Sequence, residues 1–398
     1  MSKKKDSAMA DETRIVTAGR KEAKRLGLVN PPVFHASTVL RPSLAAQKEA
    51  MAARKRGERL FFYGRDGSPT ARALEDAMAA LEGAHDCLTF SSGLGAISTA
   101  LLACLSAGDH MLVTDGVYRP VRVFCDGMLA RLGVETTYYP PRIGAGIAEL
   151  IRPNTRVVYV ESPSSQTFEM QDLPAIAEVA HAHDALVLVD NTWATPYFHK
   201  PLALGADMSI QAATKYIVGH SDAMLGTVAT TEAAWPLLRQ ATREIGQCAG
   251  PDDLYLGQRG LRSMAVRLRH QQNAAIDLAT WFKARPEVAR VLHPALPDDP
   301  GHAIWKRDFT GASGLFAVEL RPCSETALAA MVDGLEYFGI GASWGGYESL
   351  VLPANPLRTA VPWRAEGPLL RFHVGLEAPD DLKADLDAGF ARLARALA

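Results

Sequence analysis

Short apolar runs alternate with segments of helical periodicity through the first two thirds of the chain. The mainly apolar runs predict strands at 87–90, 110–114, 155–161 and 185–190. Segments with helical spacing lie at 71–78, 96–105 and 173–183. Short continuous apolar strands that alternate with helices are typical of a parallel sheet with helices on both faces. The pattern therefore predicts an α/β domain with a mostly parallel sheet.

The pattern changes after about residue 255. Residues 262–283 predict a long amphipathic helix, and Pro286 just beyond it is a common stop signal. Alternating apolar positions predict strands at 314–320 and 369–374, and residues 380–398 predict a closing helix. These elements together predict a second, smaller α+β domain at the C-terminus.

The first 60 residues or so are polar and poorly patterned, with a basic stretch at 54–56. They form either an arm that wraps a partner subunit or a frayed tail, and the pattern barely separates the two. We expect an N-terminal arm over 1–62, a large domain over 63–255 and a small domain over 256–398. The length of 398 residues agrees with two to three domains.

Composition excludes several classes of protein. The chain is 48% hydrophobic and 22% charged, and its formal net charge of -2 argues against a general nucleic-acid binder. It has no run of about 18 apolar residues, so we expect no membrane span. The five cysteines are scattered and never paired as CxxC, which indicates reduced thiols in a cytoplasmic protein. A core of this size needs no stabilising metal, and we expect no metal site.

The segment from Ala212 to Asp222, AATKYIVGHSD, is the centre of the chemical argument. A lysine becomes reactive toward carbonyl groups when a desolvated site lowers its pKa. Lys215 has small residues before it and few charges beside it, which suits a lysine that points into a pocket. An arbitrary lysine is usually a surface residue, and only the surrounding motif favours the pocket.

Two further features lie where predicted strands end. Asp190 follows the apolar run at 185–189, and α/β folds bind their ligands at the carboxyl ends of parallel strands. A carboxylate there can pair with a pyridinium nitrogen, or it can simply cap the next loop. The turn SSGLG at 91–95 precedes a helix, so its N–H groups can hold a phosphate, although an ordinary helix cap explains it equally well. Thr214, beside Lys215, offers a hydroxyl to the same phosphate.

Three segments carry a family pattern: VDNTWA at 189–194, SIQAATKYIVGHSDAM at 209–224 and SWGGYES at 343–349. Together they resemble the Cys/Met-metabolism family of pyridoxal-phosphate (PLP) enzymes of fold type I. The resemblance runs from about residue 17 to about residue 393, and its TKYxxGHSD core is specific to the family. It implies a PLP-dependent transferase-like fold, pyridoxal 5'-phosphate as the cofactor and an amino acid as the small-molecule substrate.

The resemblance implies a role for each residue around the cofactor. Lys215 would be the Schiff-base lysine and would move protons at the α and β carbons of the substrate. Tyr118 would stack on the pyridine ring and could also handle a proton, and Asp190 would hold the pyridinium nitrogen. The phosphate would be bound by Gly93, Leu94 and Thr214. Tyr118 could instead be a core tyrosine.

Other implied roles concern the substrate and a neighbouring subunit. Arg371 would form a bidentate clamp on the substrate α-carboxylate, and Ser343 and Trp344 would line the substrate side. Tyr63 and Arg65 would reach the phosphate of a neighbouring subunit, so the active sites would be shared within a homotetramer built as a dimer of dimers. A surface ion pair for Arg371 and simple packing for Trp344 are the alternatives.

The chain departs from the commonest family pattern at three places. Ala212 stands where many members have Ser, as in the branch that performs β-elimination. The run ESPSSQ at 161–166 lacks the Asn and Pro that follow the ESP turn in other branches. Arg243 stands near a position where we expect an aromatic residue, which leaves the pocket there undefined.

The residues at 161–166 and around Lys215 favour one reaction among three hypotheses. The first is β-elimination of L-cystathionine to L-homocysteine, pyruvate and ammonia in methionine biosynthesis, or the same steps on other cysteine S-conjugates. The second is a γ-lyase or γ-synthase reaction on cystathionine or methionine, against which the QAATK and ESPSS spellings argue. The third is a PLP-binding regulator without catalysis, which would leave the whole constellation unused.

Overall fold

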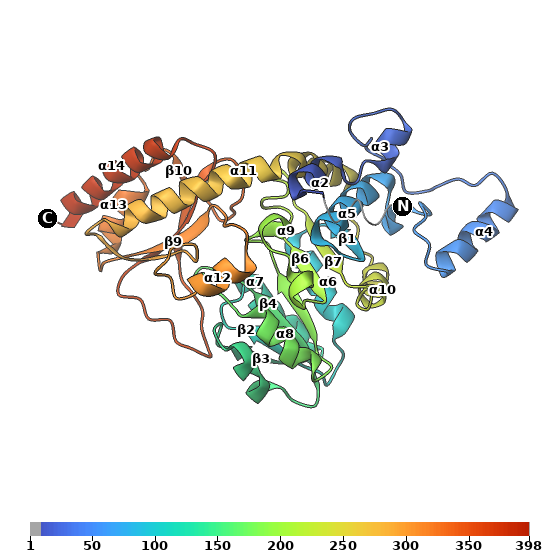
Figure 1. Cartoon of the computed structure of the whole chain (residues 1–398), viewed down its shortest axis with the longest axis horizontal. Coiled ribbons are helices and arrows are strands. Elements are labelled where there is room, and N and C mark those ends of the chain that lie inside the picture. Colours follow the sequence, from blue (N-terminus) through green and yellow to red (C-terminus); the bar gives the residue numbers. More distant parts are fainter. Residues whose placement is uncertain (1–8, 398) are drawn as a thin grey trace.

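The computed structural model describes residues 9–397. Its larger sheet has seven strands in the order β1-β7-β6-β5-β4-β2-β3 (Figure 1). These strands are β1 (Asp86–Phe90), β2 (His110–Thr114), β3 (Glu135–Tyr139), β4 (Thr155–Glu161), β5 (Leu186–Asp190), β6 (Met208–Gln211) and β7 (Gly226–Thr230). Strand β7 runs antiparallel to both of its neighbours, and every other pair of adjacent strands is parallel. The predicted α/β fold with a mostly parallel sheet is confirmed.

Helices cover both faces of this sheet. They are α5 (Pro69–Glu82), α6 (Gly93–Cys104), α7 (Arg119–Phe124), α8 (Leu173–His181), α9 (Thr195–Phe198) and α10 (Trp235–Ile245). Successive strand residues point to opposite faces. In β4, Val157 and Tyr159 therefore belong to the core beneath α6 and α7, whereas Val158 and Val160 belong to the core beneath α8.

The pattern did not predict β3, β6 and β7. Strand β3 reads ETTYY, so it has almost no apolar signal, and β6 is only four residues long. Strand β7 reads GTVAT, and its small residues are buried because it lies between β1 and β6. Short turns of 3-10 helix, η1 (Gly64–Asp66), η3 (Gly144–Leu150) and η4 (Pro201–Leu204), and a π-helical turn, η2 (Cys125–Leu129), complete this part.

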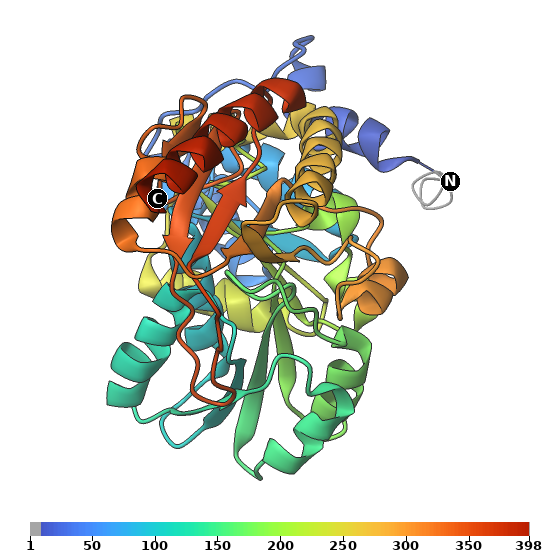
Figure 2. The same cartoon turned by 90° about the vertical axis from the view of Figure 1, so that its left-hand side faces the viewer.

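The C-terminal part contains a second sheet of five strands in the order β10-β11-β12-β9-β8. Its strands are β8 (Val288–Leu292), β9 (Leu315–Leu320), β10 (Phe338–Ile340), β11 (Ser349–Ala354) and β12 (Leu369–His373). Its helices are α12 (His302–Asp308), α13 (Glu325–Val332) and α14 (Pro379–Leu397). Figure 2 shows that residues 355–368, between β11 and β12, leave this sheet as a long loop that reaches the large sheet. We call this loop the strap.

Helix α11 (Pro251–Lys283) connects the two sheets. It begins earlier than the predicted residue 262, because Pro251 at its first position and two aspartates in its first turn suit a helix N-terminus. Its first half packs on α5, and its second half packs on β9 and β12. The boundary expected between 255 and 256 falls inside this helix, and the division into an arm, a large and a small domain stays a proposal.

The N-terminal segment contains three helices that the pattern did not predict: α2 (Asp11–Thr17), α3 (Lys21–Arg25) and α4 (Leu44–Lys55). Helices α2 and α3 are short and mostly polar, and α4 is rich in alanine, so all three have a weak apolar periodicity. Ile15 anchors α2 in the core, whereas α4 lies apart from the rest of the chain (Figure 1). Within residues 9–397, none of the helices combines the length and the apolar character that crossing a membrane requires. The five cysteines are free thiols.

Candidate active site

Two carboxylates lie at the carboxyl ends of adjacent parallel strands. Asp190 ends β5 and Glu161 ends β4, and the two residues are partners in the strand register. Asp190 Oδ1 accepts hydrogen bonds from the N–H (3.0 Å) and the hydroxyl (2.5 Å) of Thr192. Burial raises the pKa of Asp190, and burial together with the charge of Asp190 raises the pKa of Glu161. Both Thr192 hydrogen bonds end on Oδ1, so Oδ2 is free of Thr192 and can meet a cationic partner.

Lys215 follows β6 and lies beside residues of the C-terminal part that contains the second sheet. Its Nζ donates a 2.7 Å hydrogen bond to Oγ of Ser343 and lies 5.1 Å from the ring centre of Trp344. Burial, and to a smaller degree the charge of Arg371, lowers the pKa of Lys215 to about 8, although Asp190 acts in the opposite direction. The structure therefore gives Lys215 the desolvated environment that the sequence predicted.

Arg371 lies on β12 and faces the same region. One of its terminal nitrogens donates to the carbonyl oxygens of Ala342 (3.0 Å) and Ser343 (3.2 Å). Burial lowers the pKa of Arg371, which still leaves a cation at neutral pH. No carboxylate of residues 9–397 forms an ion pair with Arg371, so its charge is available to an anion from outside the chain. The alternative of a surface ion pair receives no support.

Tyr118 lies directly before α7 and is 44% exposed. Its backbone N–H donates to Oε2 of Glu161 at 2.7 Å. Burial raises the pKa of its phenol, the charges of Glu161 and Asp190 raise it further, and Arg371 opposes them. Its partial exposure argues against the alternative of a core tyrosine, and the phenol carries its proton at neutral pH.

The turn before α6 packs directly against the lysine segment. A Cβ at Gly93 would lie 2.5 Å from Cβ of Ala212, so only glycine fits there. Ser92 caps the helix by accepting from the N–H of Gly95 at 3.0 Å. Among residues 9–397, the N–H groups of Gly93 and Leu94 have no acceptor, and they lie at the positive end of α6. This arrangement fits an anion.

Thr214 is already engaged in this structure. Its hydroxyl donates to the carbonyl oxygen of Leu225 (3.1 Å) and accepts from the N–H of the same residue (2.9 Å). The hydroxyl therefore has to redirect its proton in order to donate to a phosphate. The sequence alone gave no sign of this partner.

Tyr63 and Arg65 do not join the Lys215 region within this chain. Both are exposed, and the Arg65 guanidinium lies 5.6 Å from the ring centre of Tyr63. Arg65 instead lines a cavity with Arg239 and Arg243. Burial and the neighbouring Arg239 lower the pKa of Arg243. Five arginines line this cavity against the two carboxylates of Asp66 and Glu75, so positive charge predominates there.

Sequence reasoning missed two residues that shape the site. Burial lowers the pKa of His373 to about 3, so its neutral ring can accept the hydrogen bond from the N–H of Gly345 at 3.1 Å. His373 lies two residues after Arg371 on β12, and this spacing on a strand is the signal that could have found it. Glu161 was named only as part of a turn, yet it holds the backbone of Tyr118. No group of His, Cys, Asp and Glu within residues 9–397 is arranged to hold a metal ion.

The site as built fits PLP. The buried carboxylate of Asp190, whose Oδ2 receives no hydrogen bond from Thr192, suits a pyridinium nitrogen. The unpaired N–H groups of Gly93 and Leu94 suit a phosphate, and Lys215 has a lowered pKa. An α/β fold with these groups at one end of its parallel strands defines a PLP-binding protein. The family model described as Cys/Met metabolism PLP-dependent enzyme matches residues 12–391, and the chain belongs to this family.

Individual relatives cover nearly the whole chain. It is 49% identical to a putative cystathionine beta-lyase of Rhizobium johnstonii over 98% of each protein. It is 44% identical to the cystathionine beta-lyase MetC of Escherichia coli, over 97% of this chain and 100% of MetC. The solved structure of a cystathionine gamma-lyase from Lactobacillus plantarum is 33% identical and has a TM-score of 0.88, with 97% of this chain and 100% of that one covered.

Proposed function

We propose that this chain is a cystathionine β-lyase, a carbon–sulfur lyase that converts L-cystathionine and water to L-homocysteine, pyruvate and ammonia. The observation that carries the chemistry is half-buried Lys215, whose pKa is lowered to about 8 beside Ser343 and Arg371. The choice of the β-elimination rests on the relatives named as β-lyases, at 49% and 44% identity, against 33% for the γ-lyase structure.

Five groups of this chain would hold the cofactor. Asp190 would pair with the pyridinium nitrogen, and Tyr118 would pack on the ring. The N–H groups of Gly93 and Leu94 would bind the phosphate, and the hydroxyl of Thr214, which now donates to Leu225, would join them. When bound, PLP withdraws electrons from the α-carbon of the substrate and eases the loss of its proton.

Lys215 and Tyr118 move the protons of the reaction. With a pKa of about 8, on the order of a tenth of Lys215 is the free amine at pH 7, far more than for an ordinary lysine, so Nζ can take the proton from the α-carbon and later return a proton at the β-carbon. The bond between the β-carbon and sulfur breaks, and sulfur leaves with the electron pair. The phenol of Tyr118, whose pKa is raised, keeps a proton that it can give to the departing thiolate.

Arg371 and the 343–344 pair orient the substrate. Arg371 exchanges its contacts with the carbonyl groups of Ala342 and Ser343 for a bidentate pair with the α-carboxylate. Ser343 holds Nζ of Lys215, and Trp344 covers the same amine from the side. Fixing the carboxylate in this way aligns the bond that breaks, which lowers the entropic part of the barrier.

We also propose that the active form is a homotetramer in which Tyr63 and Arg65 reach the phosphate site of a neighbouring subunit. Their exposure and their separation from the Lys215 region of the same chain support this assignment. Size-exclusion chromatography with light scattering tests the assembly. A Tyr63→Phe variant should bind PLP more weakly without a change in subunit number. The cytoplasmic location stays a proposal that cell fractionation can test.

The decisive experiment is to incubate the PLP-loaded protein with L-cystathionine and to identify the keto acid by mass. We expect pyruvate together with homocysteine, and no keto acid from a Lys215→Ala variant. A product mixture of 2-oxobutyrate and cysteine would move the enzyme to the γ-elimination branch. Bound PLP with no keto acid from any S-substituted cysteine would support the non-catalytic regulator instead.

A further inference from the structure

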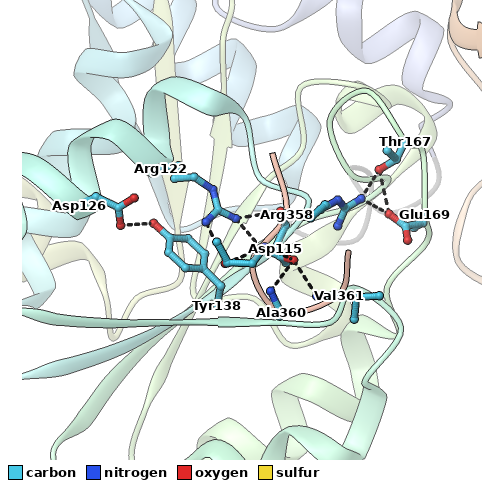
Figure 3. A network of polar contacts seen from close by, with 10 residues as sticks. Asp115, Arg122, Asp126, Tyr138, Thr167, Glu169, Arg358, Ala360 and Val361 are labelled. Carbon is cyan, nitrogen blue, oxygen red and sulfur yellow. Dashed lines mark hydrogen bonds and ion pairs between the residues drawn. The ribbon is translucent and has the colours of Figure 1, made fainter. Parts of the chain in front are cut away.

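The strap between β11 and β12 is held on the large sheet by one carboxylate (Figure 3). Asp115 follows β2 and is fully buried. Its oxygens accept hydrogen bonds from the N–H groups of Thr359 (2.9 Å), Ala360 (2.9 Å) and Val361 (3.1 Å). Three consecutive N–H groups that converge on one anion form a strong, geometrically specific contact.

Arg122 of α7 completes this contact. Its guanidinium donates to Oδ1 (2.6 Å) and to the carbonyl oxygen (3.0 Å) of Asp115, and also to the hydroxyl of Thr359 (3.2 Å). The guanidinium lies 3.6 Å from the ring centre of Tyr138, whose hydroxyl donates to Asp126 at 2.6 Å. Burial acts to raise the pKa of Asp115, but the hydrogen bonds from Thr359, Val361 and Arg122 outweigh it and lower the pKa. The carboxylate therefore stays ionised.

Arg358 provides a second attachment one residue before Thr359. Its guanidinium is almost fully buried and contacts the hydroxyl of Thr167 and the carboxylate of Glu169 (Figure 3). These two residues belong to the loop that follows Glu161 at the end of β4. The strap is thus tied to the loops after two adjacent strands, β2 and β4.

The two ends of this attachment carry different halves of the proposed active site. On the large sheet, Asp115 lies three residues before Tyr118, on the turn whose backbone Glu161 holds. On the small sheet, the strap leads directly into β12, which carries Arg371. The strap therefore connects the segment of Tyr118, which is proposed to pack on the cofactor ring, to the strand of Arg371, which is proposed to bind the substrate carboxylate.

We propose that Asp115, supported by Arg122 and Arg358, is a positioning residue that sets the place of Arg371 relative to Tyr118. This inference rests on the proposed function, in which Arg371 binds the substrate α-carboxylate. Asp115 touches neither the cofactor groups nor the substrate groups named above. Breaking the contact between Asp115 and the strap should therefore weaken substrate binding while the cofactor site stays intact.

The test compares Asp115→Asn with Asp126→Asn as a matched control, because Asp126 belongs to the same network but does not contact the strap. In Asp115→Asn, the amide that replaces the carboxylate presents an N–H₂ group to the N–H donors of the strap, so the strap should detach. We expect the amides of 359–361 to exchange hydrogen at least about tenfold faster. We expect KM to rise about tenfold or more with kcat changed less than about threefold, and the visible absorption of bound PLP to be unchanged. Asp126→Asn should change none of these.

A second pair of variants covers the case in which Asp115→Asn does not fold. Ala360→Pro removes one N–H donor from the exposed strap, and Ala360→Ser at the same position keeps it. Faster exchange in Ala360→Pro with an unchanged KM would overturn the proposal. Unchanged amide hydrogen exchange in both releasing variants, Asp115→Asn and Ala360→Pro, would also overturn it. A parallel loss of kcat and PLP absorption would overturn it as well, because it would indicate general damage to the structure.

Failure of this proposal is distinguishable from failure of the proposed function. The identity of the keto acid from the wild-type protein tests the function alone. The dissociation constant of L-alanine, titrated against PLP-loaded protein by visible absorption, tests carboxylate binding without turnover. If it rises in the releasing variants but not in the controls, the positioning role stands whatever the natural substrate is. An equal constant in all variants contradicts it.

Discussion

The Nζ atom of Lys215 donates a 2.7 Å hydrogen bond to Oγ of Ser343, a residue 128 positions further along the chain. Gly345 allows this approach, since its φ is +85° and a Cβ there would lie 2.8 Å from the carbonyl carbon of Lys215. The amine therefore meets its partner only when the segment before β11 packs on the loop after β6. The chemical environment of Lys215 is thus a product of both parts of the chain.

The lowered pKa of Lys215 has a kinetic consequence. We expect the rate at which cofactor-free protein takes up PLP to rise with pH and to level off above about 8, because only the neutral amine attacks an aldehyde. Stopped-flow absorbance across pH 6 to about 11 measures this rate. A Lys215→Ala variant should lack the reaction. An inflection near 10.5, the ordinary value for lysine, would contradict the desolvated pocket.

Arg371→Lys should separate substrate binding from chemistry. Lysine keeps the charge but loses the planar fork that pairs with a carboxylate, so we expect kcat/KM to fall about 100-fold, mainly through KM. Steady-state kinetics with cystathionine provide the numbers. Arg321→Lys serves as a control, because Arg321 bonds the carbonyl oxygen of Pro286 at 2.8 Å and lies outside the site. A fall confined to kcat would exclude the clamp.

Gly345→Ala should reduce both stability and cofactor affinity. The added methyl group combines a positive φ with a clash against the backbone of Lys215, for a cost of about 3 kcal/mol or more. Gly83→Ala isolates the first of these effects, because Gly83 has φ +71° and open space around it, and it should cost about 1 kcal/mol. Thermal unfolding and equilibrium dialysis of PLP compare the two. Equal PLP affinities would show that Gly345 does not shape the pocket.

Glu82 should make the protein less stable as pH rises. Burial raises its pKa from 4.5 to about 7, and its Oε1 accepts a 2.8 Å hydrogen bond from Ser209. The folded state thus holds a proton that the unfolded chain releases, so stability falls between about pH 4.5 and 7. We expect Glu82→Gln to add on the order of 3 kcal/mol at pH 8 and almost nothing at pH 4.

Melting temperatures at both pH values test this expectation for Glu82→Gln. Glu149→Gln, at an exposed position, is the control and should have the same small effect at both pH values. A gain from Glu82→Gln that does not change with pH would mean that Glu82 is ionised in the folded protein.

Three parallel strands of the larger sheet, β2, β4 and β5, could be predicted because each is a mainly apolar run that is largely buried on both faces. Strands β2 and β4 begin and end at the predicted residues. Strand β3 was not predicted, since its ETTYY sequence lacks the aliphatic run that marked the other strands. Helix α4 was missed for a related reason, because its alanine-rich sequence has no stripe of large apolar residues that would mark it.

Most residues of the candidate site could also be predicted from local sequence, because a motif such as TKYxxGHSD is a short continuous segment of the chain. Asp190 was found as the polar end of an apolar strand, and Arg371 through the family resemblance. The partners of these residues were not found in this way. The bond between Thr214 and Leu225, the support of Gly345 by His373, and the hold of Asp115 on the strap all join residues that are remote in sequence or have no motif.

The sequence by itself determined the order of the apolar strands and the membership of the family, and it singled out Lys215 as the candidate reactive lysine, since these depend on local spacing and residue type. Only the tertiary structure decided the pKa of Lys215, the free N–H groups at α6 and the attachment of the strap to Asp115. Desolvation and hydrogen bonding depend on which distant atoms come within a few ångströms, and packing alone brings those atoms together.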